Sequence, residues 1–255
     1  MPLSSEIVER LRAAGCVFAE EEAALLIAEA SSTDALEEFV SRRVGGEPLE
    51  YILGWAEFGG RRYFVDPGTF VPRHRTEFLV ALAVALTRKD STVLDLCCGT
   101  GALGAAVLEA VPSVQLWSSD IDARAARRNL DPTRVFEGDL FDPLPGELRG
   151  SVDVLLCNTP YVPSSEIDLL PREARLYERR ETLDGGADGL DLQRRVAAEA
   201  GEWLAPGGHV LFEVAEGQAD ASKSILEQNG FNAHLEYDDD SDTTVVVGGR
   251  WHRIT

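Results

Sequence analysis

The residues with the clearest chemical potential follow a short apolar run at 154–157. They form the tetrapeptide Asn158-Thr159-Pro160-Tyr161. A fixed amide oxygen on Asn158, with a main-chain carbonyl in the proline turn, can accept both N–H hydrogens of one amide or aromatic amine, and Tyr161 can stack on a planar group. Such a grip holds the nitrogen lone pair toward an electrophile. The pattern indicates chemistry at a planar nitrogen, although a simple turn with a packing tyrosine has the same sequence.

A second group of residues has the composition of a nucleotide-type cofactor site. An apolar run enters a glycine-containing turn, Asp95-Leu96-Cys97-Cys98-Gly99-Thr100-Gly101, and a helix is expected from Ala102. Small residues let the backbone approach a ligand, and a helix start offers unpaired N–H groups. The next apolar run ends in Asp120-Ile121, where an acid can accept both ribose hydroxyls, and Asp139-Leu140 follows the run after that.

The spacing of the turn separates two classes of cofactor. A dinucleotide site requires G-x-G-x-x-G, which Cys97, Gly99 and Ala102 do not provide. The pattern D-L-x-x-G-x-G with two later acids instead resembles the S-adenosylmethionine (AdoMet) site of class I methyltransferases. That resemblance implies a set of cofactor-binding residues: Asp95, Cys97, Cys98, Gly99, Thr100, Gly101, Asp120, Ile121, Asp139, Leu140 and Asn158.

The tetrapeptide is similar to the [DN]-P-P-[YF] motif of amino-methyltransferases, and further motifs resemble the HemK-type protein-glutamine methyltransferases. These motifs are residues 46–54, 58–60, 71–77, 183–190 and 204–208, then Glu213 and Gln218. The resemblance implies AdoMet as methyl donor and, as acceptor, the glutamine side-chain amide in the Gly-Gly-Gln loop of peptide-chain release factors. It also implies that the catalytic residues are Asn158, Thr159, Pro160 and Tyr161.

Three departures from the family pattern leave other acceptors open. Thr159 and His74 stand where the family has proline, and Arg179 stands where proline follows the glutamate. The alternatives are N-methylation of a small metabolite or peptide amide or amine, N-methylation of a nucleic-acid base, and an AdoMet-binding scaffold without activity.

Composition argues against several classes of partner. The 255 residues include 24 basic and 44 acidic side chains, a formal net charge of −20, which repels phosphate backbones and anionic membranes. No apolar run approaches the ~20 residues of a membrane span. The four cysteines lack paired C-x-x-C spacing and the four histidines lack metal-ligand spacing. We therefore expect a cytoplasmic, monomeric protein with no bound metal and no direct nucleic-acid or membrane partner.

Three segments are expected to position these residues. Residues 1–45 have helical apolar spacing and predict a small helical substrate-recognition domain, in which Asp34, three residues before Glu37, predicts a helix cap. Residues 46–75 alternate and contain aromatic side chains, which predicts a linking β-hairpin. Residues 76–255 are expected to form the AdoMet-binding catalytic domain.

The catalytic segment alternates apolar runs with helical stretches, which indicates an α/β fold with a mostly parallel sheet. Its expected strands are 92–96, 114–119, 133–136, 152–157, 209–214, 231–237 and 243–247. The short acidic connection before the last strand predicts a terminal antiparallel hairpin. The expected fold is the Rossmann-like, seven-stranded fold of class I methyltransferases.

Overall fold

A bundle of three helices begins the chain in the computed structural model, which describes residues 2–250. The helices are α1 (Pro2–Ala13), α2 (Ala19–Glu29) and α3 (Thr33–Val44). Apolar side chains at helical spacing meet between them, among them the fully buried Leu11, Leu26 and Val40. The cap of α3 is Ser32, whose hydroxyl accepts a hydrogen bond from Ala35 N at 3.1 Å, so the expected cap at Asp34 is wrong by two residues.

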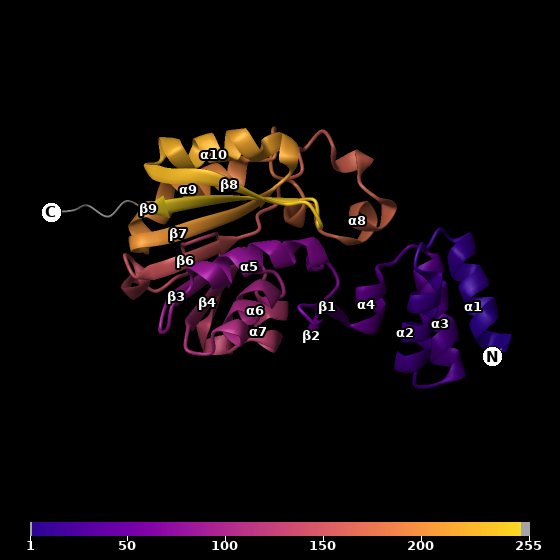
Figure 1. Cartoon of the computed structure of the whole chain (residues 1–255). Coiled ribbons are helices and arrows are strands. Elements are labelled where there is room, and N and C mark those ends of the chain that lie inside the picture. Colours follow the sequence, from indigo (N-terminus) through magenta and orange to yellow (C-terminus); the bar gives the residue numbers. More distant parts are fainter. Residues whose placement is uncertain (1, 251–255) are drawn as a thin grey trace.

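A short helix and a hairpin join this bundle to the rest of the chain. The helix α4 (Leu49–Leu53) is followed by the strands β1 (Trp55–Phe58) and β2 (Arg61–Phe64), which pair antiparallel. The predicted hairpin is therefore present, between residues 55 and 64. In Figure 1 it lies between the N-terminal helices and the large sheet.

The large sheet has seven strands in the order β5-β4-β3-β6-β7-β9-β8. They are β3 (Thr92–Leu96), β4 (Gln115–Asp120), β5 (Val135–Glu137), β6 (Val152–Cys157), β7 (Leu204–Val214), β8 (Phe231–Asp238) and β9 (Thr243–Arg250). The first five run parallel, and β9 is antiparallel to both β7 and β8. The predicted α/β fold with a mostly parallel seven-stranded sheet is confirmed.

Helices cover both faces of this sheet. The covering helices are α5 (Glu77–Leu86), α6 (Ala102–Ala110), α7 (Arg124–Asn129), α9 (Asp191–Trp203) and α10 (Ala219–Gln228). The short helix α8 (Arg172–Tyr177) contributes to neither core of the sheet. Short 3-10 turns occupy His74–Thr76, Pro132–Arg134, Gly146–Leu148, Ile167–Leu169, Arg180–Thr182 and Glu216–Gln218. No helix within residues 2–250 has the length and apolar character to cross a membrane.

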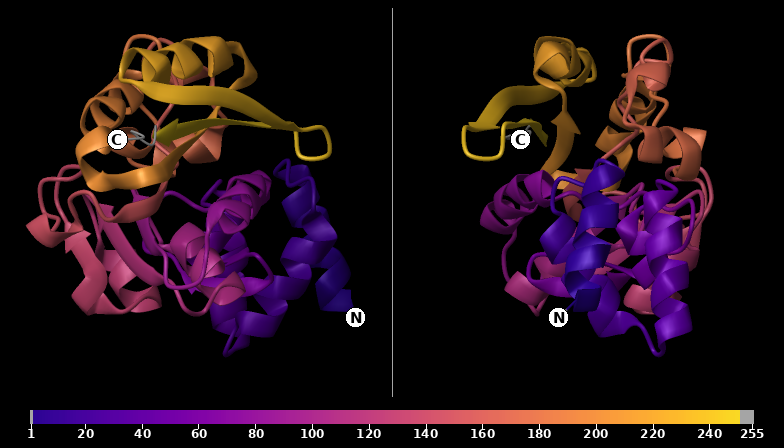
Figure 2. Two further views of the ribbon diagram at one scale, coloured as in Figure 1. Left: turned by 60° about the vertical axis from the view of Figure 1, so that its left-hand side comes forward. Right: turned by 90° about the vertical axis from the view of Figure 1, so that its right-hand side faces the viewer.

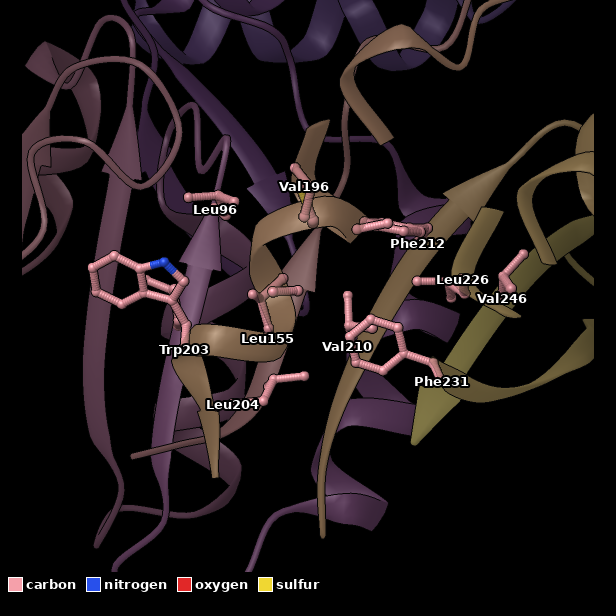
Figure 3. Close-up of a cluster of buried hydrophobic side chains, with 14 of the residues drawn as sticks. Leu96, Leu155, Val196, Trp203, Leu204, Val210, Phe212, Leu226, Phe231 and Val246 are labelled. Carbon is pink, nitrogen blue, oxygen red and sulfur yellow. The ribbon is translucent and has the colours of Figure 1, made fainter. Parts of the chain in front are cut away.

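Alternate strand residues fill two separate cores, one on each face of the sheet. On one face, α5 and α6 pack against side chains such as Val93 and Val154. On the other face, α9 and α10 pack against their strand neighbours Leu94 and Leu155, as Figure 3 shows for Leu155 near Val196. Both cores bury most residues of β3 and β6, and the carboxyl ends of β3, β4 and β6 lie together at one edge.

Two further features of the shape are the position of the N-terminal helices and the direction of the loop between β8 and β9. The views in Figure 2 show the N-terminal helices beside the α/β unit and the loop between β8 and β9 extending away from the sheet. The β8–β9 pair is the predicted terminal hairpin. The β8–β9 loop lies at the sheet edge where β3, β4 and β6 end, because β9 runs antiparallel to β7 and its Thr244 pairs with Val214 at the carboxyl end of β7. The Thr243 hydroxyl donates to the carbonyl of Arg75 at 3.3 Å.

Candidate active site

The turn after β3 adopts a left-handed backbone conformation at several residues. Cys97 has a φ of 58°, and Gly99 and Gly101 have φ values of 53° and 77°. For a cysteine this conformation costs about 1–2 kcal/mol, so the surrounding structure must hold Cys97 in place. Cys97, Cys98, Gly99 and Thr100 line a large cavity at this edge of the sheet, whereas Gly101 faces Leu130 behind the turn.

Asp95 also lies behind the turn and not in the cavity wall. Its carboxylate is buried and accepts a hydrogen bond from the backbone N–H of Gly104, the third residue of α6, at 2.9 Å. Burial raises the pKa of Asp95 to about 7, and the negative charge of Asp120 adds to this rise. Asp95 therefore fixes the start of α6 to the end of β3, a supporting position that its place in the motif did not reveal.

Asp120 ends β4 and lies in the cavity wall. One carboxylate oxygen accepts from Gly99 N and the other from Asp122 N, both at 2.8 Å. Burial raises the pKa of Asp120, while these two backbone bonds oppose the rise. Each oxygen keeps a further lone pair for a ribose hydroxyl, so the donor and acceptor chemistry at this position fits the cofactor.

The residues that follow β4 and β5 complete this end of the cavity. Ile121 is 63% exposed, while Leu140 is buried and has a φ of 47°. Both line the cavity, and together they offer apolar surface to a planar base. Asp139 also lines the cavity, although its carboxylate is already paired with Arg195 at 2.8 Å.

The tetrapeptide begins directly after β6 and lines the same cavity. Within residues 2–250, neither the Asn158 side chain nor the Thr159 carbonyl has a hydrogen-bond partner. The Thr159 hydroxyl is fully buried and has no partner either. Two acceptor oxygens on consecutive residues are thus free at the carboxyl end of a central strand, as the grip on a nitrogen requires.

A glycine-containing loop holds the tetrapeptide from one side. The Gln218 amide donates to the carbonyl of Tyr161 at 2.8 Å and to that of Asp188 at 2.9 Å. Gly189 has a φ of 81°, and a Cβ there would lie 2.2 Å from the Tyr161 carbonyl oxygen. The motif at 183–190 therefore packs against the backbone of the tetrapeptide, and Gln218 ties the two together.

The Tyr161 ring is held by two charged side chains. Arg75 donates a hydrogen bond to the Tyr161 hydroxyl, and the Nε atom of Arg75 lies 3.4 Å from Glu213 Oε1. The hydroxyl itself lies 3.4 Å from the same Glu213 oxygen. Burial raises the pKa of Tyr161 to about 12 and also raises the pKa of Glu213. Tyr161 therefore remains a neutral phenol whose ring is fixed in the cavity wall.

The cavity has a volume of about 1210 Å³ and brings together most of the predicted residues. This volume exceeds the roughly 300–1,000 Å³ of a pocket for one small ligand, so it leaves room for an acceptor beside a cofactor. Its outer walls come from two segments that the sequence did not indicate as part of the site. They supply Gly68, Thr69, Phe70, Pro72 and Arg73, then Leu170, Pro171, Glu173, Ala174 and Arg179.

Ion pairs explain how these distant segments reach the site. Arg73 pairs with the buried Glu178 at 2.6 Å, and Arg179 pairs with Asp122 at 2.8 Å. The hydrogen bond that the Arg124 side chain donates, assisted by the positive charges of Arg124 and Arg179, lowers the pKa of Asp122 to about 2. No periodic pattern in the sequence predicts these contacts, because they join residues far apart in the chain.

Comparison with known proteins relates the chain to methyltransferases. Residues 67–178 match the family model described as "Methyltransferase small domain". A methyltransferase from Pyrococcus furiosus shares the fold, with a TM-score of 0.55 at 16% identity over 74% of this chain and 89% of that one.

Two relatives share much more of the sequence. The release factor glutamine methyltransferase of Geobacter sulfurreducens is 37% identical over 218 residues, which are 83% of this chain and 76% of that protein. The 4-amino-L-phenylalanine/4-methylamino-L-phenylalanine methyltransferase of Streptomyces pristinaespiralis is 35% identical over 208 residues, 77% of this chain and 70% of that protein. The chain belongs to the release factor glutamine methyltransferase family of AdoMet-dependent N-methyltransferases.

Proposed function

We propose that this protein transfers a methyl group from AdoMet to the side-chain amide nitrogen of a glutamine in a peptide-chain release factor. The observation that carries the proposal is the pair of free acceptor oxygens on Asn158 and Thr159, in the wall of the cavity that also holds Gly99 and Asp120. The name and the 37% identity of the Geobacter sulfurreducens relative support the choice of acceptor.

The residues at the ends of β3, β4 and β5 are proposed to hold the cofactor. When bound, AdoMet supplies an electrophilic methyl group on a positively charged sulfur. The Asp120 carboxylate would accept hydrogen bonds from the ribose hydroxyls, and Ile121 and Leu140 would border the base. The turn at 97–100 would lie against the rest of the cofactor, with Asp95 supporting that turn from behind.

The tetrapeptide is proposed to hold the acceptor. An amide nitrogen is a poor nucleophile because its lone pair is delocalised into the carbonyl group. Asn158 Oδ1 and the Thr159 carbonyl can accept its two N–H hydrogens and hold the nitrogen in line for attack, while the Tyr161 ring bounds the planar group. The nitrogen forms a bond to the methyl carbon as the methyl–sulfur bond breaks, and it gives up one proton to water. The methylated product keeps one N–H instead of two, so one of these hydrogen bonds is lost and release of the product is favoured.

We further propose that residues 1–45 form a domain that recognises the protein substrate and that residues 76–255 form the catalytic domain. Residues 46–75 would be the linker that joins these two domains. The residues that line the cavity all come from position 68 onward, so the helical bundle is free to contact a large partner. The net charge of −20 suits a basic partner protein. All four cysteines are free thiols, in keeping with a reducing cytoplasm.

A second candidate function is N-methylation of a small aromatic amine. The relative from Streptomyces pristinaespiralis, named for 4-amino-L-phenylalanine, favours it at 35% identity. An arylamine nitrogen also carries two hydrogens for Asn158 and Thr159, and its ring could stack on Tyr161.

Methyl transfer from radiolabelled AdoMet separates these candidates. The purified protein is incubated in parallel with a release factor, with the variant of that factor whose Gly-Gly-Gln glutamine is alanine, with 4-amino-L-phenylalanine, and with nucleic acid. We expect label in the release factor alone and none in its alanine variant. Label in 4-amino-L-phenylalanine without label in the release factor would establish the second candidate instead.

A further inference from the structure

The short helix α8 forms part of the cavity wall without belonging to either core of the sheet. Glu173 and Ala174 of α8 line the cavity together with Leu170 and Pro171 just before it. No strand pairs with this segment, so side-chain contacts at its two ends determine where it lies.

The first end of α8 is attached to the N-terminal helical bundle. Arg43, near the end of α3, donates to the Glu173 carboxylate at 2.8 Å and to the Glu47 carbonyl at 3.0 Å. The same guanidinium donates to Glu22 on α2 at 2.6 Å. The Arg43 side chain is only 12% exposed, so this is a largely desolvated charge with two carboxylate partners.

The second end of α8 is attached to the segment after the hairpin. Glu178 directly follows α8, and its side chain is 1% exposed and paired with Arg73 at 2.6 Å. Tyr177 packs against a small cluster that includes Tyr51 and Val71. This end is therefore fixed by burial as well as by charge, which leaves the Arg43–Glu173 pair as the attachment of the opposite end.

We propose that Arg43 is a positioning residue for the acceptor side of the cavity. By holding Glu173, it sets where α8 stands opposite the tetrapeptide, so the helical bundle influences acceptor binding through α8 without itself lining the cavity. Removing Arg43 leaves the Glu173 carboxylate, whose side chain is 37% exposed, without this partner, and α8 would then shift toward water. The proposal rests on the proposed function, because it concerns the acceptor of that reaction.

Kinetics of four full-length variants test the proposal: R43Q, E173Q, the double variant, and R10Q as control. Arg10 pairs with Glu37 through two hydrogen bonds of 2.7 Å, wholly within the helical bundle. We expect R43Q and E173Q each to raise the KM for the release factor roughly tenfold, and the double variant to raise it no further. The kcat and the Kd for AdoMet should change less than about threefold, and R10Q should leave the KM unchanged.

Multiplied effects in the double variant would overturn the proposal, because they would show that Glu173 acts on the acceptor independently of Arg43. A KM that R43Q leaves unchanged would overturn it as well. Equal KM effects in R10Q and R43Q would also overturn it, since they would point to general loosening of the bundle.

Hydrogen exchange of the free protein separates this inference from the proposed function. R43Q and E173Q should increase the exchange of the amides of residues 172–178, and R10Q should not. Unchanged exchange in R43Q overturns the inference whatever the acceptor is. If the wild-type protein methylates no release factor, the proposed function is wrong, but the inference about Arg43 is still tested by hydrogen exchange. If 4-amino-L-phenylalanine is methylated instead, the KM values of the variants are compared with that compound as substrate.

Discussion

The backbone N–H of Gly104 donates to the buried carboxylate of Asp95 at 2.9 Å, and a Cβ at Gly104 would lie 3.0 Å from the same oxygen. The contact joins the end of β3 to the first turn of α6 and leaves no space for a larger residue. Within residues 2–250 no cation contacts Asp95, so burial is the main cause of its raised pKa.

This environment predicts how Asp95 affects stability as the pH changes. The pKa of Asp95 is raised to about 7 in the folded protein, so between pH 4 and 7 the folded state holds a proton that the unfolded state has lost. The free energy of unfolding due to this group is therefore highest at low pH and falls as the pH rises toward 7. Asp95→Asn removes the titration, so its stability relative to the wild type should rise by up to about 1.4 kcal/mol per pH unit over this range.

Urea unfolding of both proteins without AdoMet, at pH 5.5 and pH 8, measures the effect. A stability difference that is the same at the two pH values would show that Asp95 does not titrate in this range.

Asp120→Ala should weaken AdoMet binding by about 1.5–3 kcal/mol, the range for hydrogen bonds to a charged group. The variant removes the proposed ribose acceptor and also the two bonds to Gly99 N and Asp122 N. Isothermal titration calorimetry gives the affinity, and Asp139→Ala is the matched control, because Asp139 is already paired with Arg195. An unchanged affinity in Asp120→Ala would remove this residue from the cofactor site.

Asn158→Ala should lower kcat by about 10²–10³ while the Kd for AdoMet changes little, because the side chain acts on the reacting nitrogen. Asn158→Asp should keep part of the activity, since its carboxylate still offers an acceptor oxygen. Steady-state kinetics with the release factor and calorimetry with AdoMet measure the two effects. Full turnover by Asn158→Ala with any verified acceptor would show that the tetrapeptide is only a turn and does not hold the acceptor.

Thr159→Val should raise the free energy of unfolding by about 1 kcal/mol, because a buried hydroxyl without a partner costs about 1–3 kcal/mol. Activity should persist, because the proposed grip uses the carbonyl of this residue. Thr159→Pro, which restores the family pattern, should keep or raise activity on a release factor. Chemical denaturation and kcat measure both, and a large loss of kcat in Thr159→Val would assign the hydroxyl a role in the reaction.

Gly189→Ala should lower kcat by about tenfold or more, because its Cβ would lie 2.2 Å from the Tyr161 carbonyl oxygen and 2.3 Å from the Gln218 amide. Gly201→Ala is the control, since its Cβ meets nothing within 4 Å and alanine favours the helix α9. Kinetics and thermal unfolding of both variants make the comparison. Wild-type kcat in Gly189→Ala would show that the loop does not position the tetrapeptide.

Most of the fold was predictable because buried parallel strands are continuous apolar runs, and all seven expected strands are present. The start of β7 was not predictable. It begins at Leu204, five residues before the expected 209, because Leu204 pairs with Val152 across a register shift. The sequence Pro206-Gly207-Gly208 lies between Leu204 and the expected start at 209, and it predicts a turn when the partner strand is unknown.

Some parts of the candidate site were predictable from the sequence and others were not. The turn at 97–100, Asp120 and the tetrapeptide were predictable as one site, because parallel strands end at the same edge. Asp95 was expected to contact the cofactor and instead lies behind the turn, since its position in the motif does not give its direction. The walls at 68–73 and 170–179 depend on ion pairs between distant residues, and a local pattern contains no trace of them.

Two different sets of contacts hold the walls of the cavity. Gln218 and the loop at 183–190 clamp the tetrapeptide, whereas α8 is attached to Arg43 and Arg73, outside the sheet. Mutations in the α8 segment can therefore reshape what enters the cavity while the groups that hold the nitrogen stay in place. This separation gives a physical route by which one scaffold could diverge toward a protein side chain in one lineage and a free aromatic amino acid in another, as the names of two relatives at 37% and 35% identity indicate.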